Sequence, residues 1–336
     1  MFQSSRRSFA RAMTWELGTG SLPEDRAAGG RLRARVYRHV AWARHDGLAR
    51  LVEEDDLDPR QRLRSARAAR QWRAEHGVPA GAARAVFVVG VQRSGTNMIV
   101  RGIERDPSVE THNENDSRVF DRFCLREDDV VRGVVARSRS AVVLFKPLCD
   151  SHRTAELLTS VATSDGPAPL AVWVYRDVDA RARSAVHKFG DVNRRVLTEI
   201  ADGTAAGRWQ AHGLSESSLE LIRRLRPATL SPVSAAALFW LVRNRLYLEQ
   251  GLDRRRDVHL VSYDRVVADP EPEVEILARF LGMRFSPAMT AGIECRAGRP
   301  RRSDLDLRVR AACTELELEL GLAAERSARR VLAGRG

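Results

Sequence analysis

The stretch VVGVQRSGTNMIV, from Val88 to Val100, decides the fold of this chain. A valine-rich run ends at Gly90, and Gly95 completes a G-x-x-x-x-G frame, which is typical of a phosphate-binding loop between a strand and a helix. Backbone N–H groups of such a loop and the positive end of the following helix together bind anions. Nucleoside triphosphatases carry lysine directly after the second glycine, but this chain has Thr96. We therefore expect the loop to bind an anion other than a Mg²⁺-bound triphosphate.

From residue 85 onward, strand-like and helix-like segments alternate. Short valine-rich runs are typical of strands buried on both faces of a parallel sheet, and they occupy Ala85–Val89, Ala141–Phe145, Ala171–Tyr175 and Val258–Ser262. Segments with helical spacing occupy Gly95–Arg105, Thr154–Thr163, Asp179–Phe189, Ser231–Gln250 and Pro272–Leu281, the last resembling a crossover helix. The alternation predicts an α/β fold, with a P-loop NTPase-like parallel β-sheet and helices on both faces.

Residues 1–80 have a different pattern. Arg31–Leu51 and Pro59–His76 carry apolar or small residues at helical spacing, with many arginines between them. Glycine and proline in Gly77–Gly81 then interrupt the pattern. We expect a helical N-terminal extension over residues 1–80 and one α/β domain over residues 81–336.

The chain of 336 residues carries a net charge of +12. Nearly every base is arginine, since Lys146 and Lys188 are the only lysines, and the bases are scattered among acids. We interpret this charge as a composition bias, and we expect no nucleic-acid partner. No apolar run approaches the ~20 residues of a membrane-spanning helix, so we expect no integral membrane segment.

The spacing of the cysteines indicates whether the chain has a metal site, and the N-terminal sequence indicates where in the cell the protein is located. The four cysteines lack C-x-x-C spacing, so we expect reduced thiols and no metal site. Ser5–Phe9 resembles a twin-arginine export signal, but Met13–Gly18 is mixed in polarity where export requires an apolar segment. We therefore expect a cytoplasmic protein.

A second segment, VWVYRDVDARARSAVHKFG at 172–190, follows a later valine-rich strand. Arg176 stands at the end of that strand and Ser184 stands eight residues later, about two helical turns along. With the first loop, this segment resembles the P-loop-like domain of bacterial sulfotransferases that use 3′-phosphoadenosine-5′-phosphosulfate (PAPS). The resemblance covers about Ala85 to Phe285.

The resemblance implies a role for each matching residue. The first loop would hold the 5′-phosphosulfate end of the donor through Arg93, Ser94, Gly95, Thr96 and Asn97. Arg176 and Ser184 would hold the 3′-phosphate. In VHLVSYDRVV, Tyr263 would approach the adenine, with a plain core tyrosine as the alternative.

The general base is sought in His112–Arg118, a polar cluster that follows a short strand expected at Val109. Family branches use a glutamate or a histidine here, so we place Glu114 first, Asp116 second and His112 third. The glutamate-threonine-arginine triplet of the tyrosylprotein branch is absent, and Asp116-Ser117-Arg118 is its nearest equivalent. The alternative is a solvated, capped turn before a helix at Arg118.

In sulfuryl transfer, negative charge develops on the bridging oxygen that leaves with the nucleotide, and a nearby positive charge neutralises it. Lys146 follows the expected strand at 141–145, and family members with a lysine here use it on the transferring group; Arg93 is expected to share that role. The alternative for Lys146 is an ordinary solvated lysine. Arg299, Arg301 and Arg302 resemble a late basic loop that covers the nucleotide. For Trp240, Arg243 and Tyr247, we prefer core packing to a place at the acceptor.

The resemblance, with these residues, implies an enzyme, a PAPS-dependent sulfotransferase that acts without a metal on a hydroxyl of a small-molecule, glycan or lipid acceptor. The alternative from the same loop is a P-loop-like kinase or nucleotide-binding protein with an atypical loop. A third hypothesis is a polyanion-binding module without catalysis. The sequence carries no signal for the acceptor's identity or the oligomeric state.

Overall fold

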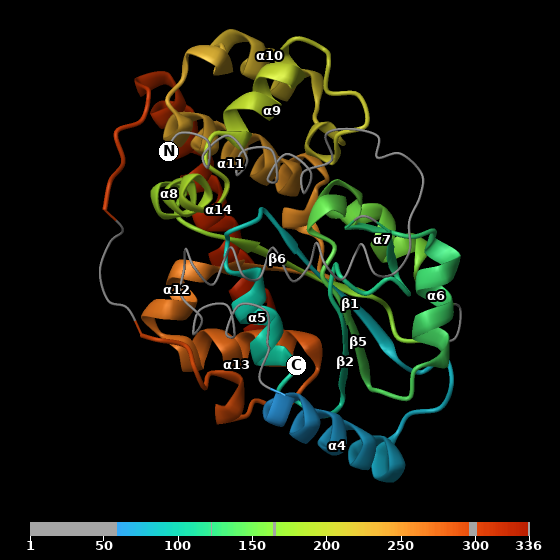
Figure 1. Ribbon diagram of the computed structural model, residues 1–336. Coiled ribbons are helices and arrows are strands. Elements are labelled where there is room, and N and C mark those ends of the chain that lie inside the picture. Colours follow the sequence, from blue (N-terminus) through green and yellow to red (C-terminus); the bar gives the residue numbers. More distant parts are fainter. Residues whose placement is uncertain (1–58, 122, 164–165, 296–300, 335–336) are drawn as a thin grey trace, which may run out of the picture. The chain divides into compact units, whose positions relative to one another are not determined.

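The computed structural model describes residues 59–121, 123–163, 166–295 and 301–334 (Figure 1). The chain divides into two compact units, Met1–Gln71 and Trp72–Gly336. Helix α4 (Pro59–His76) has the bounds expected from the sequence. The helix expected at 31–51 lies outside the described residues, and the division at residue 80 stays a prediction.

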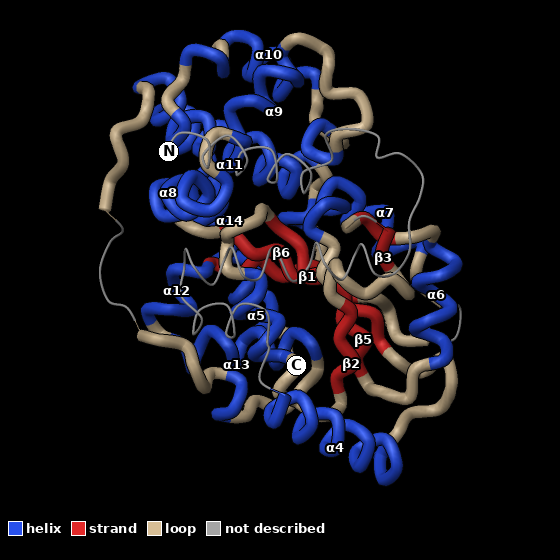
Figure 2. Tube along the Cα trace, viewed as in Figure 1, coloured by secondary structure: helices blue, strands red, loops and turns tan. Residues whose placement is uncertain are grey.

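The second unit is built on a five-stranded sheet whose strands all run parallel, in the order β2-β5-β1-β6-β7 (Figure 2). The strands are β1 (Arg84–Gly90), β2 (Val109–His112), β5 (Val142–Phe145), β6 (Leu170–Tyr175) and β7 (Val258–Ser262). The register pairs Phe87 with Phe145 and Gly90 with Val174. The side chains of β5 and β7 are buried throughout, which explains why their sequences are continuously apolar or nearly so. The predicted α/β fold is confirmed.

Helices cover both faces of this sheet (Figure 1). On one face, Ile99 and Ile103 of α5 and Leu277 of α13 pack against alternate valines of the strands. On the other face, Trp173 of β6 packs beneath α11, where its Nε1 donates to Asn244 Oδ1 over 3.2 Å. The α-helices of this unit, after α4, are α5 (Thr96–Ile103), α6 (Asp128–Arg137), α7 (Thr154–Ser160), α8 (Val178–Phe189), α9 (Val192–Ala201), α10 (Glu216–Leu225), α11 (Pro232–Glu249), α12 (Tyr263–Ala268), α13 (Pro270–Leu281) and α14 (Leu307–Ala333).

Short 3₁₀ helices and one hairpin complete the described part of this unit. The 3₁₀ helices are η1 (Leu148–Arg153), η2 (Trp209–Ala211), η3 (Pro227–Thr229), η4 (Leu252–Arg254) and η5 (Pro287–Met289). The hairpin pairs β3 (Phe120–Asp121) with β4 (Cys124–Leu125). The alternative interpretation of the polar cluster included a helix that begins at Arg118. The hairpin occupies that position, so the prediction of this helix is wrong.

The expectation that Pro272–Leu281 is a crossover helix is also wrong. The helix starts earlier, at Pro270, and it follows β7, which is the last strand of the sheet in the described chain, so no later strand remains for the helix to lead to. Helix α14 instead covers this edge, because Ser327 Oγ accepts the N–H of Leu260 over 3.2 Å and contacts His259 Nδ1 at 2.8 Å. A free strand edge exposes unpaired backbone groups, and Ser327 satisfies one of them.

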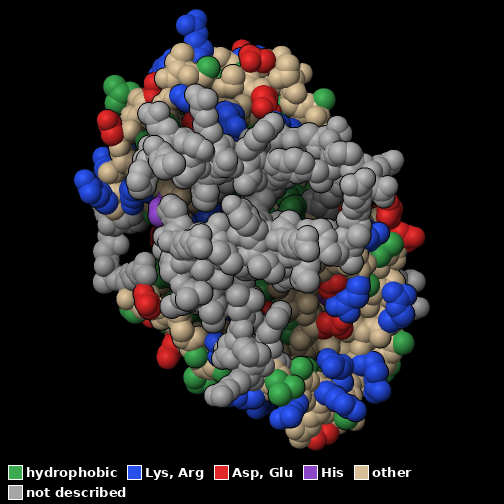
Figure 3. All heavy atoms as spheres, in the orientation of Figure 1, with side chains coloured by type: hydrophobic (Ala, Val, Ile, Leu, Met, Phe, Trp, Pro, Cys, Tyr) green, Lys and Arg blue, Asp and Glu red, His purple; other side chains and the backbone are tan. Residues whose placement is uncertain are grey.

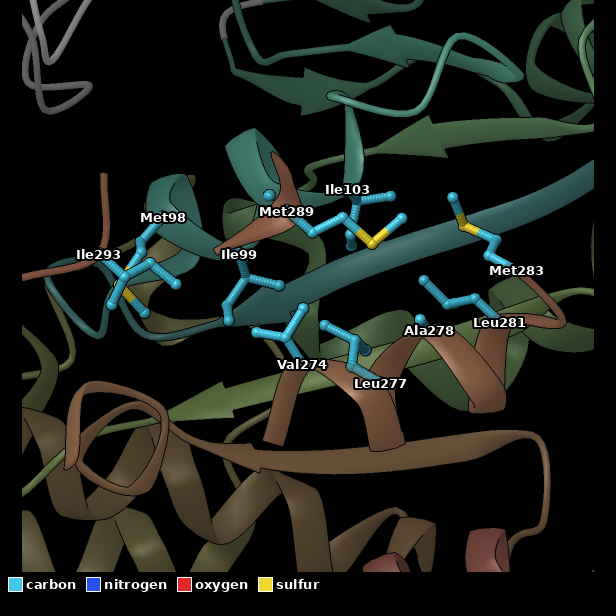
Figure 4. Close-up of a pocket in the computed structure, with 11 residues that line it drawn as sticks. Met98, Ile99, Ile103, Val274, Leu277, Ala278, Leu281, Met283, Met289 and Ile293 are labelled. Atoms are coloured by element: carbon cyan, nitrogen blue, oxygen red, sulfur yellow. The ribbon is translucent and has the colours of Figure 1, made fainter. Parts of the chain in front are cut away.

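A gap remains between α5 and α13 (Figure 4). Its lining is almost entirely apolar and includes Ile99, Leu277 and Met289, and its volume is about 10 Å³. That volume admits about one water-sized probe, and an apolar cavity of this kind stays dry. The gap is therefore a packing defect of the core and not a ligand site.

The strand order places the carboxyl end of β1 at a reversal of connectivity. After β1 the chain runs to the edge strand β2, returns to β5 beside β1, and then crosses to β6 on the other side of β1. Parallel α/β sheets bind ligands in the crevice outside the carboxyl ends of the strands at such a reversal. The loop that carries the G-x-x-x-x-G frame, Gly90–Asn97, lies at this point.

Candidate active site

Both glycines of the G-x-x-x-x-G frame are required by their surroundings. Gly90 has φ +138°, and a Cβ there would lie 2.3 Å from the carbonyl oxygen of Val174. Gly95 has φ +92°, and a Cβ there would lie 2.0 Å from Cδ2 of Tyr263. Any other residue would have to move the neighbouring strand or the tyrosine ring. The spacing read from the sequence therefore reflects two separate close approaches of backbone to a neighbour.

Between these glycines the loop turns sharply and buries its polar side chains. Arg93 adopts a left-handed φ of 70°, which is uncommon outside glycine and is found at functional sites. Ser94 is fully buried, and its Oγ has no hydrogen-bond partner among the described residues. Thr96 starts α5 and is also buried. The first N–H groups of this helix have no intrahelical partner, so they remain available to an anion.

The second predicted segment begins at the carboxyl end of β6 and continues into α8. Asp177 caps this helix, because its Oδ1 accepts the N–H of Ala180 over 2.8 Å. On the next turns of α8, Ser184 Oγ accepts a hydrogen bond from Arg93 Nε over 3.1 Å. The two motifs, 91 residues apart in the sequence, are thus in direct contact.

Arg176 does not pair with either neighbouring aspartate as an ordinary strand-end arginine would. Its guanidinium lies 4.5 Å from the centroid of the Tyr263 ring, and its Nε is buried without a hydrogen-bond partner among the described residues. Its carbonyl oxygen accepts Nε1–H of Trp240 over 2.8 Å. Asp179 is instead bound by both terminal nitrogens of Arg310. Arg176 is therefore held in place with an unused donor.

Tyr263 links the two motifs. The ring lies against Gly95 on one motif and beneath the guanidinium of Arg176 on the other. Because Ser262 caps α12 by accepting the N–H of Arg265, the start of this helix is fixed directly after β7. An approach of Tyr263 to an adenine stays a prediction.

Lys146 is not a solvated lysine. It follows β5, its side chain is 11% exposed, and its Nζ donates to Asn97 Oδ1 over 2.7 Å. The same Nζ lies 3.4 Å from Oε2 of Glu114, whose side chain is 18% exposed. Burial raises the pKa of Glu114, and the charge of Lys146 opposes that rise. A carboxylate with a raised pKa beside a cation at the end of the sheet is a candidate proton acceptor.

The other two candidate bases are bound to each other. Nδ1 of His112 lies 2.7 Å from Oδ2 of Asp116, and the buried ring stacks on Phe145. Arg118 also binds Asp116, with Nη2 to Oδ2 at 2.6 Å. The hydrogen bonds from Arg118, followed by the one from His112, hold the pKa of the Asp116 carboxyl well below its usual range. Such a carboxyl is a weak base, so the geometry favours Glu114 among the three.

The late basic loop is anchored to α8. Ser303 donates its backbone N–H to Asp179 Oδ1 over 2.7 Å, and its Oγ accepts Nη1 of Arg183 over 2.8 Å. Arg301 and Arg302 are exposed beside this anchor. Arg299 lies outside the described residues. Trp240, Arg243 and Tyr247 are fully buried on α11, which confirms core packing for these three.

Two buried charged residues near the site were not predicted. Asp150 is 5% exposed and accepts the N–H of Leu125 over 2.8 Å, and burial raises its pKa to about 6. Arg181 on α8 is fully buried beneath the loop. Asp150 lies outside both motifs, and Arg181 lies within the second one at a position to which the resemblance assigns no role. Only the partners that the fold brings from distant segments distinguish the two residues from surface charges.

Two further findings concern metal and membrane. Within 59–121, 123–163, 166–295 and 301–334, no three His, Cys, Asp or Glu side chains gather as a metal site. No helix in those ranges is both long and apolar enough to cross a bilayer. The absence of a catalytic metal stays a prediction.

Comparison with known proteins gives a family match and several distant structural matches. The sulfotransferase domain family matches residues 83–294. Among solved structures, a sulfotransferase from Alicyclobacillus acidocaldarius shares 16% identity over 74% of this chain and 96% of its own, with a TM-score of 0.40. The sulfotransferase domain of the Synechococcus PCC 7002 olefin synthase shares 13% identity over 70% and 95% of the two chains, with a TM-score of 0.41. The sulfotransferase domain from the curacin biosynthetic pathway shares 11% over 72% and 98%, with a TM-score of 0.37. No curated protein matches the chain.

Proposed function

The chain belongs to the sulfotransferase domain family, and from this we propose that it transfers the sulfuryl group of PAPS to a hydroxyl group of an acceptor. The observation that carries the proposal is the hydrogen bond from Arg93 Nε to Ser184 Oγ, at 3.1 Å. It places the loop implied for the 5′ end of the donor beside the residues implied for its 3′-phosphate. One adenosine bisphosphate would then span both motifs.

The donors left unused in the protein fit this anion. Ser94 Oγ in the loop and Arg176 Nε after β6 are both buried without a hydrogen-bond partner among the described residues. Buried donors are nearly always paired with protein, water or a ligand, so these two are available to the acceptor atoms of a ligand. Phosphate and sulfate oxygens suit both, because charge-assisted hydrogen bonds are stronger than neutral ones.

Sulfuryl transfer requires one proton acceptor and one positive charge. The acceptor's oxygen forms a bond to sulfur while the bond from sulfur to the bridging oxygen of the nucleotide breaks. Glu114, as its carboxylate, would take the proton that the acceptor hydroxyl loses. Lys146 Nζ, 2.7 Å from Asn97 Oδ1 in the loop, would neutralise the charge that develops on the leaving oxygen, together with Arg93.

One observation favours the alternative, a P-loop-like kinase or nucleotide-binding protein. Lys146 reaches the loop from β5 and contacts Asn97, so it brings to the loop an amine that Thr96 lacks. A lysine displaced in this way would suit a nucleoside triphosphate as well. The two proposals differ in the ligand, because a kinase requires Mg²⁺ with its triphosphate and the sulfotransferase does not.

The acceptor is sought among small molecules, glycans and lipids with a free hydroxyl, and the cytoplasmic location and the absence of a nucleic-acid partner stay predictions. Incubation with donor labelled at sulfur, in cell extract fractions, tests the activity directly. We expect label in a new, acid-labile sulfate ester together with release of adenosine 3′,5′-bisphosphate (PAP). Transfer of label from ATP labelled at the γ-phosphate, with none from the sulfur donor, supports the kinase instead.

A further inference from the structure

Arg181 lies on the same side of α8 as Ser184, since the two residues are three positions apart on the helix. Its side chain is 0% exposed, among the largest fully buried side chains of the described residues. Ser184 contacts the side chain of Arg93, and Arg181 contacts the backbone one residue earlier. Helix α8 therefore meets the loop at two adjacent points.

The contacts of Arg181 fix the loop to the core. Its Nε donates to the carbonyl oxygen of Gln92 over 3.1 Å, and its Nη1 donates to the carbonyl oxygen of Ala236 on α11 over 2.7 Å. The guanidinium also lies 5.3 Å from the centroid of the Phe239 ring. Gln92 precedes Arg93, whose φ is 70°. Arg181 thus holds the peptide that leads into the left-handed turn.

The charge of Arg181 has no carboxylate partner in the described part of the chain. Its side chain contacts two carbonyl oxygens, an aromatic ring and the amide oxygen of Asn193 at 3.5 Å, and its Nη2 is buried without any partner there. Burial and the charge of Arg93 lower its pKa to about 9, so the side chain stays charged at neutral pH. An isolated buried charge is costly, and an anion bound nearby offsets that cost.

We propose that Arg181 is a positioning residue of the donor site, which holds the Gln92–Arg93 peptide and supplies a buried positive charge beneath the 5′ anion of the donor. The inference rests on the proposed function, because the 5′ anion is that of PAPS or PAP. In nucleoside triphosphatases the loop lysine supplies the positive charge that stabilises the bound anion. Arg181 would supply that charge here from beneath the loop, without contact to the reacting atoms.

Three ligands separate this role from a general effect on folding. PAP carries both phosphates, adenosine 5′-monophosphate carries only the one placed in the loop, and adenosine 3′-monophosphate carries only the one placed at Arg176. Affinities are measured by calorimetry or competition in EDTA for the wild type, Arg181→Gln and Arg181→Lys. Arg223→Gln is the matched control, since Arg223 forms an exposed pair with Glu216 on α10.

We expect Arg181→Gln to bind PAP and the 5′-monophosphate about 10- to 100-fold more weakly, as for a lost contact to a charged group. Binding of the 3′-monophosphate should change less than about twofold in the same variant. Arg181→Lys retains the charge and should recover most of the lost affinity. A fall of equal size for all three ligands, with no rescue by lysine, identifies a merely structural residue and overturns the inference.

Two outcomes remain distinct. If the wild type binds no PAP, the proposed function fails, whereas normal PAP binding by Arg181→Gln overturns only the role of Arg181. If Arg181→Gln does not fold, Arg181→Met replaces it, because an apolar side chain of similar length suits the surroundings of Phe239. If neither folds, Arg181→Lys decides, and a tenfold loss of 5′-phosphate affinity in that variant contradicts the inference.

Discussion

The guanidinium of Arg93 donates from Nε to Ser184 Oγ across 3.1 Å, and the guanidinium of Arg176 stacks on Tyr263 beside the same loop. Each contact joins a residue from the end of one strand to a residue from a different strand–helix unit. Because β1 and β6 are adjacent and parallel, their carboxyl ends lie side by side, and the two motifs that follow these strands are therefore neighbours. The contact between Arg93 and Ser184 therefore follows from the strand order, and the ligand specificity would follow from the contact.

Replacement of Arg176 by alanine tests the expected 3′-phosphate contact. The variant loses a planar charged group whose buried Nε has no partner in the described protein. We expect PAP to raise the melting temperature of the wild type and to leave that of Arg176→Ala nearly unchanged. Arg223→Gln should keep the full thermal shift. A wild-type shift in Arg176→Ala would remove Arg176 from the donor site.

Replacement of Glu114 by glutamine separates chemistry from binding. The amide keeps the size of the side chain but cannot accept a proton, so PAP binding should persist while kcat falls by about 10²–10⁴. Turnover is measured with the acceptor that the labelled-sulfur screen identifies. Asp116→Asn is the comparison variant, because Asp116 is already bound by His112 and Arg118. Loss of turnover in Asp116→Asn with full activity in Glu114→Gln would reverse the assignment.

Replacement of Gly95 by alanine tests the contact between the loop and Tyr263. The added Cβ would meet the ring at 2.0 Å, and the left-handed φ of +92° costs about 1–2 kcal/mol more for alanine than for glycine. Gly292→Ala is matched in backbone, with φ +93° and nothing within 4 Å, so it carries the strain without the clash. Unfolding free energies should fall further for Gly95→Ala than for Gly292→Ala. In the double variant with Tyr263→Ala, we expect that excess to disappear.

The buried carboxyl of Asp150 should make stability depend on pH. Burial raises its pKa from 3.8 to about 6, so the folded state binds the proton more tightly than the unfolded state. That stabilisation is complete below about pH 4 and is lost as the pH rises through about 6. Asp150→Asn removes this loss, so relative to the wild type it should gain about 2 kcal/mol between pH 4 and pH 7. Denaturant unfolding at both pH values checks this, and a constant difference would contradict it.

The strands and both motifs could be predicted from the sequence because their signals are local. Strands buried on both faces have few places for polar residues, so β1, β5, β6 and β7 are all readable as valine-rich runs. Gly90 and Gly95 mark close backbone approaches, and such positions accept only glycine. Arg176 and Ser184 could be singled out because the resemblance to the sulfotransferase family implies an arginine after a strand and a serine eight residues later.

The remaining features depend on contacts between distant segments. Arg181 and Asp150 are charged residues in polar surroundings of the sequence, and burial is imposed on them by Phe239, Ala236 and Leu125. The hairpin of β3 and β4 has strands of two residues each, which is too short for a period-2 pattern. β7 is the last strand of the sheet in the described chain, which excludes a crossover after it, and this is a property of the whole fold and not of local composition.

Titration calorimetry with PAP and with ATP in the presence of Mg²⁺ tests the central claim most directly, namely that the Gly90–Asn97 loop and the Arg176–Ser184 motif hold one adenosine bisphosphate. In EDTA, we expect PAP to bind the full chain at one site. This binding should be at least about tenfold tighter than that of Mg²⁺-ATP, since the 3′-phosphate of PAP, which ATP lacks, adds charge-assisted contacts. Binding of Mg²⁺-ATP as tight as that of PAP, or no binding of PAP, would contradict the account.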